Sequence, residues 1–225
     1  MISNRNIARI VGALFLTVNI TFIAGVMSIE AILGSPEYLV IASANRAQII
    51  LGVLLEIING IAYLGIAMLM FPILKQRFES LALGFVAFRI IEFVMQILAD
   101  LSPLSLLNLS EGFLKAGSPE SSIFQTMGAS LLADRFWAFQ MISITFGLGA
   151  LFFYIILYKI KLVPRFISIW GLIGVTVVLV NTILDMLGFP PGNLGVLMLL
   201  NELFLGVWLI VKGFNSTAII SDDAN

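Results

Sequence analysis

The sequence predicts an all-α membrane protein built as a bundle of six transmembrane helices, and three observations lead to this fold class. Of the 225 residues, 60% are hydrophobic and only 11% are charged, whereas a soluble domain of this size is about a quarter charged and under half apolar. The mean hydropathy is +1.08. Six apolar stretches each reach the roughly 20 residues that a helix needs to cross a hydrocarbon core about 30 Å thick.

The six expected spans belong to one transmembrane domain that covers residues 1–225, and short polar segments separate several of them. "GSPEY" (34–38), "KQRFES" (75–80) and "KIKLVPR" (159–165) lie between spans, and "GFPPGN" (188–193) predicts a tight turn, because prolines between glycines cannot continue a helix. The spans are expected at about residues 8–33, 47–73, 81–107, 134–158, 165–188 and 194–214.

The distribution of basic residues predicts the orientation of the bundle. Cytoplasmic loops of membrane proteins carry an excess of Lys and Arg near the ends of the spans. If the N-terminus is cytoplasmic, the outer side has only Arg46, Lys115 and Arg135. Both termini are therefore predicted to be cytoplasmic. The basic residues on the cytoplasmic side are then Arg5, Arg9, Lys75, Arg77, Lys159, Lys161, Arg165 and Lys212.

One connection differs from the others in length. The outer loop between the third and fourth spans is expected to run from Asn108 to about Ala133, and Ser118 followed by Pro119 is typical of a helix start. The segment is apolar enough to lie on the outer membrane surface as an interfacial helix, which we favour over a lid.

The composition excludes several classes of chemistry. The chain has no Cys and no His, which removes thiolate nucleophiles, the usual zinc sites and every His-based general base. We expect no metal and no cofactor. The net charge of -1 arises from 12 basic and 13 acidic residues, so the overall charge does not indicate a nucleic-acid partner.

A polar stripe runs along the third expected span. Arg89, Glu92, Gln96 and Asp100 are spaced by three, four and four residues, which places all four side chains on one helix face. A charged side chain at the centre of a bilayer costs at least about 2.5 to 3.5 kcal/mol. Other spans must therefore cover this face.

Arg89, Glu92 and Glu202 fall near the same depth, around the midplane of the membrane, and Glu56 lies above them. At about 1.5 Å per residue from the cytoplasmic ends, Arg89 lies about 12 Å deep, Glu202 about 15 Å, Glu92 about 17 Å and Glu56 about 24 Å. Asp100 and Asp185 come out close to the outer surface and are expected to be hydrated. The predicted polar core consists of Arg89, Glu92, Glu202, Glu56, Asn59, Asn19 and Gln96.

The formal charge of this core leaves two interpretations open. Glu56, Glu92 and Glu202 oppose the single Arg89, an imbalance that buried groups do not tolerate without a remedy. One interpretation is a structural cluster in which Arg89 ties carboxylates together, with the third one neutral. The other is a site that takes a cation, a proton or a small molecule.

The sequence resembles a family of uncharacterised bacterial membrane proteins, domain of unknown function 4386, over about residues 5 to 214. The likeness rests on "LGFVAFRIIEFV", "LYKIKLVPRFISIWGLIG" and "NELFLGVWLIVKGF". The resemblance implies six helices in a bacterial cell membrane, and it implies no catalytic roles. The positions that match the family's recurrent residues are Arg89, Glu92, Pro164, Arg165, Trp170, Gly171, Glu202, Trp208, Lys212 and Gly213.

Three functions compete. The favoured hypothesis is binding or transport of a small molecule or cation, with Glu92 and Glu202 as the binding groups and Arg89 as their counter-ion. The alternative is a non-catalytic structural or regulatory membrane protein whose polar core is a packing salt bridge. An intramembrane enzyme acting on a lipid ranks below both, because none of the common catalytic motifs is present. The expected partners are the lipid bilayer and, under the favoured hypothesis, a small-molecule or cation ligand. No nucleic-acid partner is expected, and the oligomeric state is not predicted.

Overall fold

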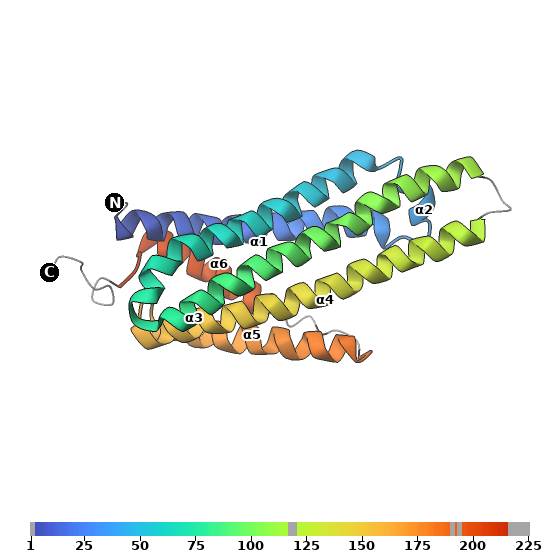
Figure 1. Cartoon of the computed structure of the whole chain (residues 1–225). Coiled ribbons are helices and arrows are strands. Elements are labelled where there is room, and N and C mark those ends of the chain that lie inside the picture. The colour runs from blue at the N-terminus through green and yellow to red at the C-terminus, as the bar shows by residue number, and fades with distance from the viewer. Residues whose placement is uncertain (1–2, 117–120, 190–191, 193–194, 216–225) are drawn as a thin grey trace.

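The computed structural model describes residues 3–116, 121–189, 192 and 195–215, and this part of the chain is helical without any strand. Figure 1 shows the helices lying roughly alongside one another in a long bundle. In chain order they are α1 (Asn4–Leu33), α2 (Tyr38–Ile41), α3 (Arg46–Ala116), α4 (Ser121–Ile160), α5 (Arg165–Met186) and α6 (Val196–Val211).

The 71 residues of α3 do not form one straight helix. They form two helical arms, the first before Phe78 and the second after it. Phe78 has φ -142° and ψ 66°, which is not helical, and the chain reverses there (Figure 1). The arms lie side by side, because Gln96 in the second arm donates a hydrogen bond of 2.9 Å to Glu56 in the first. The reversal falls within the predicted break "KQRFES".

The two ends of the bundle differ. Arg5 Nη2 donates to the carbonyl of Val211 at 2.7 Å, which joins the start of α1 to the end of α6. The reversal at Phe78 and the junction between α4 and α5 lie at the same end, which we term the basal end (Figure 1). The opposite end, near α2 and Ala116, is the apical end.

In the part of the chain that the structure describes, four helices, α1, α3, α4 and α5, are long and apolar enough to cross a membrane. The 16 residues of α6 are apolar but extend only about 24 Å. Large apolar side chains cover the outside of the bundle, including Met68 at 71% exposed and Ile20 at 66%. This surface suits a hydrocarbon environment.

The predicted outer loop over residues 108–133 is wrong. Helix α3 continues to Ala116 and α4 begins at Ser121, while Ser118 and Pro119 lie outside the described residues. The extensions bury apolar side chains between themselves and α2: Leu109 is buried, and Phe113 packs edge-on against Phe124 with ring centroids 6.1 Å apart. Span prediction searches for apolar segments of the length that crosses a bilayer. It therefore does not register that a helix continues beyond the bilayer. At 40 residues, α4 is about 60 Å long.

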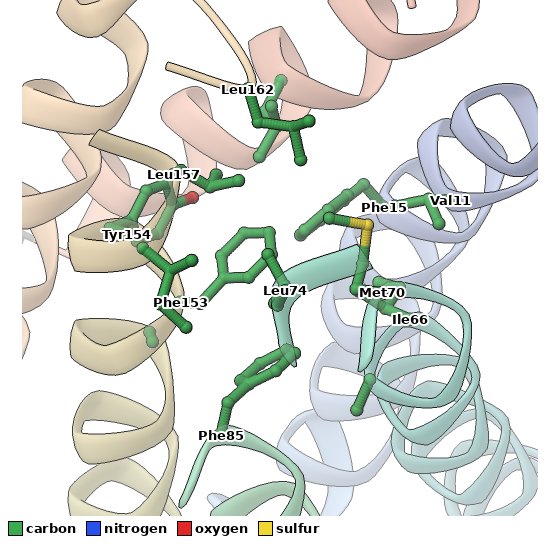
Figure 2. Close-up of a cluster of buried hydrophobic side chains, with 14 of the residues drawn as sticks. Val11, Phe15, Ile66, Met70, Leu74, Phe85, Phe153, Tyr154, Leu157 and Leu162 are labelled. Carbon is green, nitrogen blue, oxygen red and sulfur yellow. The ribbon is translucent and has the colours of Figure 1, made fainter. Parts of the chain in front are cut away.

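An aromatic core closes the basal half of the bundle (Figure 2). Phe85 stacks on Phe153 at 5.0 Å between ring centroids, and Phe15 lies 6.1 Å from Phe153. These rings join α1, the second arm of α3 and α4, and Met70 and Leu162 fill the space beside them. This aromatic core adjoins a buried charge, because the guanidinium of Arg89 lies 5.6 Å from the ring centroid of Phe85.

Helices α1 and α6 approach each other closely at two glycines. A Cβ atom added at Gly12 would lie 2.5 Å from the carbonyl oxygen of Gly206, and one added at Gly206 would lie 3.0 Å from the carbonyl oxygen of Gly12. Small residues at a helix crossing permit this backbone contact. The crossing brings Glu202, one turn before Gly206, into the interior.

Candidate functional site: a cavity at a buried ion pair

Four buried side chains form an inner cluster: Tyr63, Arg89, Glu92 and Glu202. Arg89 Nη1 donates to Glu92 Oε2 at 2.7 Å, and the two side chains are 4% and 9% exposed. Tyr63 OH donates to Glu202 Oε2 at 2.8 Å. The inner cluster therefore joins both arms of α3 to α6.

Aromatic rings surround the guanidinium of Arg89. Its Cζ lies 4.3 Å from the ring centroid of Tyr63, 4.8 Å from that of Phe146 and 5.6 Å from that of Phe85. A cation over aromatic faces gains attraction from the ring quadrupoles, most of all where water is excluded. The rings and the carboxylate of Glu92 together hold Arg89 in place. Among the described residues, no group forms a hydrogen bond with its Nε atom.

A cavity of about 470 Å³ adjoins the inner cluster. Tyr63, Arg89, Glu92 and Glu202 all line it, and its walls come from α1, both arms of α3, α4, α5 and α6. At its other end the lining includes Gly192, Gly195 and Val196, which are exposed. The cavity thus leads from the surface near the α5–α6 connection to buried charge.

Amide groups and aromatic rings make up much of the remaining wall. Asn59 Nδ2 donates to the carbonyl of Val18 at 2.7 Å, and Asn19 Nδ2 donates to that of Phe15 at 2.8 Å. Both amides are thereby held against α1. Other lining residues are Gln96, Asn181, Ser143, Phe22, Phe93 and Phe139. The walls combine hydrogen-bonding groups with apolar surface, as small-molecule sites do.

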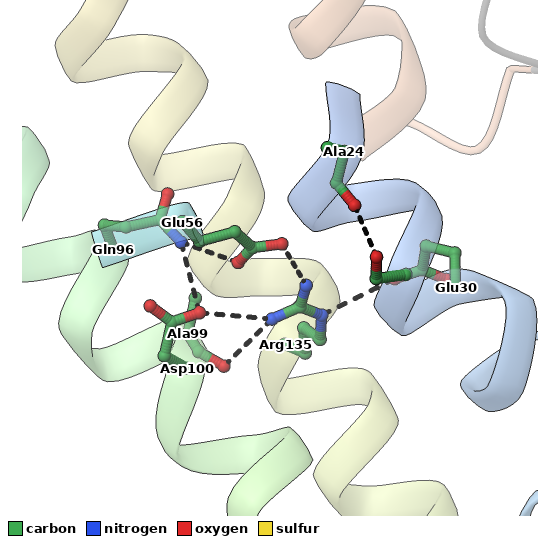
Figure 3. A network of polar contacts seen from close by, with 8 residues as sticks. Ala24, Glu30, Glu56, Gln96, Ala99, Asp100 and Arg135 are labelled. Carbon is green, nitrogen blue, oxygen red and sulfur yellow. Dashed lines mark hydrogen bonds and ion pairs between the residues drawn. The ribbon is translucent and has the colours of Figure 1, made fainter. Parts of the chain in front are cut away.

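A second group of charges, the outer cluster, lies towards the apical end and consists of Arg135, Glu30, Glu56 and Asp100. Arg135 Nη2 binds Glu56 Oε1 at 2.8 Å, Nε lies 3.5 Å from Glu30 Oε1, and Nη1 lies 3.6 Å from Asp100 Oδ1 (Figure 3). Arg135 is only 3% exposed. It ties α4 to α1 and to both arms of α3.

The structure separates Glu56 from the residues with which the sequence analysis grouped it. Arg89, Glu92, Glu202, Asn59, Asn19 and Gln96 all line the cavity, whereas Glu56 does not. Glu56 pairs instead with Arg135, and Asp100, expected to be hydrated, is 3% exposed. The depth estimate had placed Glu56 above the other three charges, but depth along a helix axis does not say which neighbouring helix supplies a partner.

Arg135 is the buried charged residue that sequence reasoning missed. Its position near the end of an expected span made it look like an exposed charge of the outer side. The available signal was charge balance, because Glu30, Glu56 and Asp100 lie at similar distances from the basal end and needed a cation. Arg135 lies at a similar distance from the basal end, at the start of the fourth expected span, and is the cation available to these carboxylates.

Gln96 links the cavity to the outer cluster. Its side chain lines the cavity, and its Nε2 donates to Glu56 Oε2 at 2.9 Å and to Asp100 Oδ1 at 3.3 Å. One amide thus bridges the cavity wall and the outer cluster.

Formal charge distinguishes the cavity from a neutral pocket. Glu92 and Glu202 oppose Arg89, so the charged lining residues sum to -1. Within the part of the chain that the structure describes, no group of three or more acidic side chains is arranged to hold a metal ion. The cavity therefore presents one carboxylate in excess, beside amides and rings.

Long apolar helices around a buried charged cavity define the class: the protein is a helical membrane protein. The model of the family described as "Domain of unknown function (DUF4386)" matches residues 10–213, and the chain belongs to this family. No curated protein and no solved structure is significantly similar to the chain.

Proposed function

We propose that the protein binds, and moves across the membrane, a small amphiphilic cation that occupies the cavity beside Glu92 and Glu202. The observation that carries the proposal is the cavity itself: about 470 Å³ of space reaches a buried cluster whose formal charge is -1. A fully packed interior around Arg89 would have argued for a purely structural cluster.

The chemistry of the walls supports a ligand that is both positive and apolar. Arg89 is already paired with Glu92 at 2.7 Å, whereas Glu202, which accepts hydrogen bonds from Tyr63 and Asn19, forms no ion pair among the described residues. Phe22, Phe93 and Phe139 offer apolar contact along the same cavity. An ammonium or phosphonium group near Glu202 would restore charge balance.

The structural alternative is supported at the outer cluster. Arg135 lies among three carboxylates, none of which lines the cavity, and its contacts reach three separate segments of the bundle. A charge that ties several helices together in this way serves packing. We therefore assign structure to the outer cluster and ligand binding to the inner one.

The proposed topology is six spans in one domain, in a bacterial cell membrane, with both termini cytoplasmic. The two arms of α3 supply two spans, and α1, α4, α5 and α6 supply the others. The basal end carries Arg5, Lys75, Lys159 and Arg165, which favours its placement at the cytoplasmic face. α6 is shorter than a bilayer core, which is consistent with its first residues lining the cavity mouth.

Binding of tetraphenylphosphonium, an apolar cation, tests the ligand class. We expect detergent-purified protein to bind it in equilibrium dialysis, and Glu202→Gln to weaken binding by about tenfold or more, since about 1.4 kcal/mol of lost attraction has that effect. Gln keeps an oxygen that accepts the hydrogen bond from Tyr63, so the fold is expected to persist.

Glu79→Gln is the matched control, because it makes the same change of charge at an exposed residue outside the cavity. It should bind tetraphenylphosphonium like the wild type. Ser143→Leu, which narrows the cavity without changing charge, should also weaken binding. Equal affinity in Glu202→Gln and Glu79→Gln would show that the cation binds elsewhere and would refute the proposal.

Cysteine labelling tests the topology, since the chain has no native cysteine to remove. Ser80→Cys lies at the basal end and Ser122→Cys near the tip of α4, and both positions are exposed. In intact cells we expect a membrane-impermeant maleimide to label Ser122→Cys and to label Ser80→Cys only after lysis. The reverse pattern would invert the orientation, and labelling of both in intact cells would contradict six spans.

A further inference from the structure

A second cavity, of about 480 Å³, lies at the basal end, where α4, α5 and α6 meet. None of its lining residues lines the first cavity. Its walls are the turn between α4 and α5 and the segment that follows α6. The lining residues are Lys161, Leu162, Val163, Pro164, Arg165, Trp208, Lys212, Gly213, Phe214 and Asn215.

Backbone hydrogen bonds hold the walls of this basal pocket together. Leu162 N donates to the carbonyl of Leu157 at 3.3 Å, which closes the end of α4 with Lys161 in the left-handed conformation at φ 56°. Asn215 N donates to the carbonyl of Leu162 at 2.8 Å, and Asn215 Nδ2 donates to that of Lys161 at 3.3 Å. The segment after α6 is thus fastened to the α4–α5 turn.

Three cationic side chains line the basal pocket without an acidic one. Lys161, Arg165 and Lys212 are all exposed, and among the described residues none of them forms an ion pair. The guanidinium of Arg165 lies 5.2 Å from the ring centroid of Tyr158. The pocket therefore concentrates a formal charge of +3 within one concave surface.

Helix ends do not account for all of these cations. Lysines near helix C-termini often complement the helix dipole, but Arg5 already donates to the last carbonyls of α6, at 2.7 Å to Val211 and 3.3 Å to Ile210. Arg165 is the first residue of α5, where a positive charge opposes the dipole. The first turn of α5 has no acidic residue and no side-chain cap. An external anion would complement both the positive end of the helix dipole at the start of α5 and the charge of Arg165.

An aromatic surface continues from the basal pocket along α5 and α6. Trp208 lines the pocket and stacks on Phe204, with ring centroids 6.3 Å apart, and Phe204 lies 5.8 Å from Phe166 and 5.9 Å from Trp170. Phe166 is 52% exposed and Phe204 is 40% exposed. Exposed rings next to a basic pocket are suited to the boundary between lipid headgroups and acyl chains.

We propose that the basal pocket binds the phosphate-containing headgroup of an anionic phospholipid, whose acyl chain lies over Phe166, Phe204 and Trp208. Lys161, Arg165 and Lys212 surround the phosphate, which lies at the positive end of the helix dipole at the start of α5. The assignment uses the membrane setting of the proposed function but not its ligand cavity. Arg165, Trp208 and Lys212 are then lipid-binding residues.

Native mass spectrometry of the detergent-purified full chain measures the binding directly. We expect the wild type to retain dioleoyl-phosphatidylglycerol in preference to dioleoyl-phosphatidylcholine. The triple variant Lys161→Asn, Arg165→Gln, Lys212→Gln should lose that retention by about tenfold or more. Asn is chosen at position 161 because it tolerates the left-handed backbone there.

A second triple variant, Lys75→Gln, Arg77→Gln, Lys159→Gln, removes three basic residues that do not line the pocket. It should retain phosphatidylglycerol like the wild type, and an equal loss in both triple variants would overturn the proposal in favour of general charge attraction. Tetraphenylphosphonium binding should be unchanged in both triple variants. The proposed lipid site and the proposed cation site are therefore tested independently of each other.

Glycerol phosphate separates a lipid from a soluble phosphate compound. We expect millimolar glycerol phosphate to displace little phosphatidylglycerol, and Phe204→Leu to weaken lipid retention severalfold, because the acyl chain contributes contact area. Efficient displacement by glycerol phosphate together with no effect of Phe204→Leu would show a soluble phosphate ligand and would overturn the lipid assignment.

Discussion

Arg135→Met is expected to destabilise the protein by about 3 to 5 kcal/mol, the usual cost of removing one partner from a buried ion pair. Arg135 is 3% exposed and lies 2.8 Å from Glu56 and 3.6 Å from Asp100. Met retains the length of the side chain, so the loss arises mainly from carboxylates left buried without a cation. Thermal unfolding in detergent, compared with the wild type, measures it.

Arg46→Met is the control, because Arg46 also pairs with a carboxylate but at the surface. Its 3.0 Å contact with Glu111 joins side chains that are 51% and 45% exposed, and such pairs contribute under about 1 kcal/mol. Adding Glu56→Gln to Arg135→Met should recover part of the stability, since it removes one of the unpaired charges. If Arg135→Met melts like Arg46→Met, the outer cluster does not hold the helices together.

Gly12→Ala is expected to have the second largest effect, a loss of about 1 to 3 kcal/mol from overpacking. Its Cβ would lie 2.5 Å from the backbone oxygen of Gly206, which no side-chain rotation can relieve. Helices α1 and α6 must therefore separate. Because α6 carries Glu202, we also expect weaker tetraphenylphosphonium binding than in the wild type.

Gly65→Ala provides the comparison for Gly12→Ala. Gly65 also lies within a helix, and the one atom near its added Cβ is Leu14 Cδ1 at 3.3 Å, the end of a flexible side chain. The substitution should be neutral or stabilising, because Ala favours the helix by up to about 1 kcal/mol over Gly. Equal melting temperatures for the two variants would contradict the close crossing of α1 and α6.

Several features of the site could be predicted from local pattern. Arg89, Glu92 and Gln96 recur at helical spacing in an apolar stretch, so they had to share a face that avoids lipid. The side chains of all three line the cavity. Glu202 and Asn19 were placed near the same depth, and the structure places them on that cavity too. Such predictions require only the position of a residue on its own helix and its depth in the membrane.

Other features depended on which helices meet. Glu56 was grouped with Arg89 in one polar core, but its partner is Arg135 on α4. The continuation of α3 to Ala116 and of α4 from Ser121 was missed as well. That continuation arises from packing among Leu109, Phe113 and Phe124, which hydropathy windows do not register.

The sequence by itself determined the membrane class, the apolar segments and the polar face of the third predicted span, because each depends on composition or on the geometry of one helix. The tertiary structure alone decided the pairing of Arg135 with Glu56, the close crossing at Gly12 and Gly206, and the two cavities. Those features are distances between helices, and they depend on how side chains from several segments fit together. Periodicity along one helix does not contain that information.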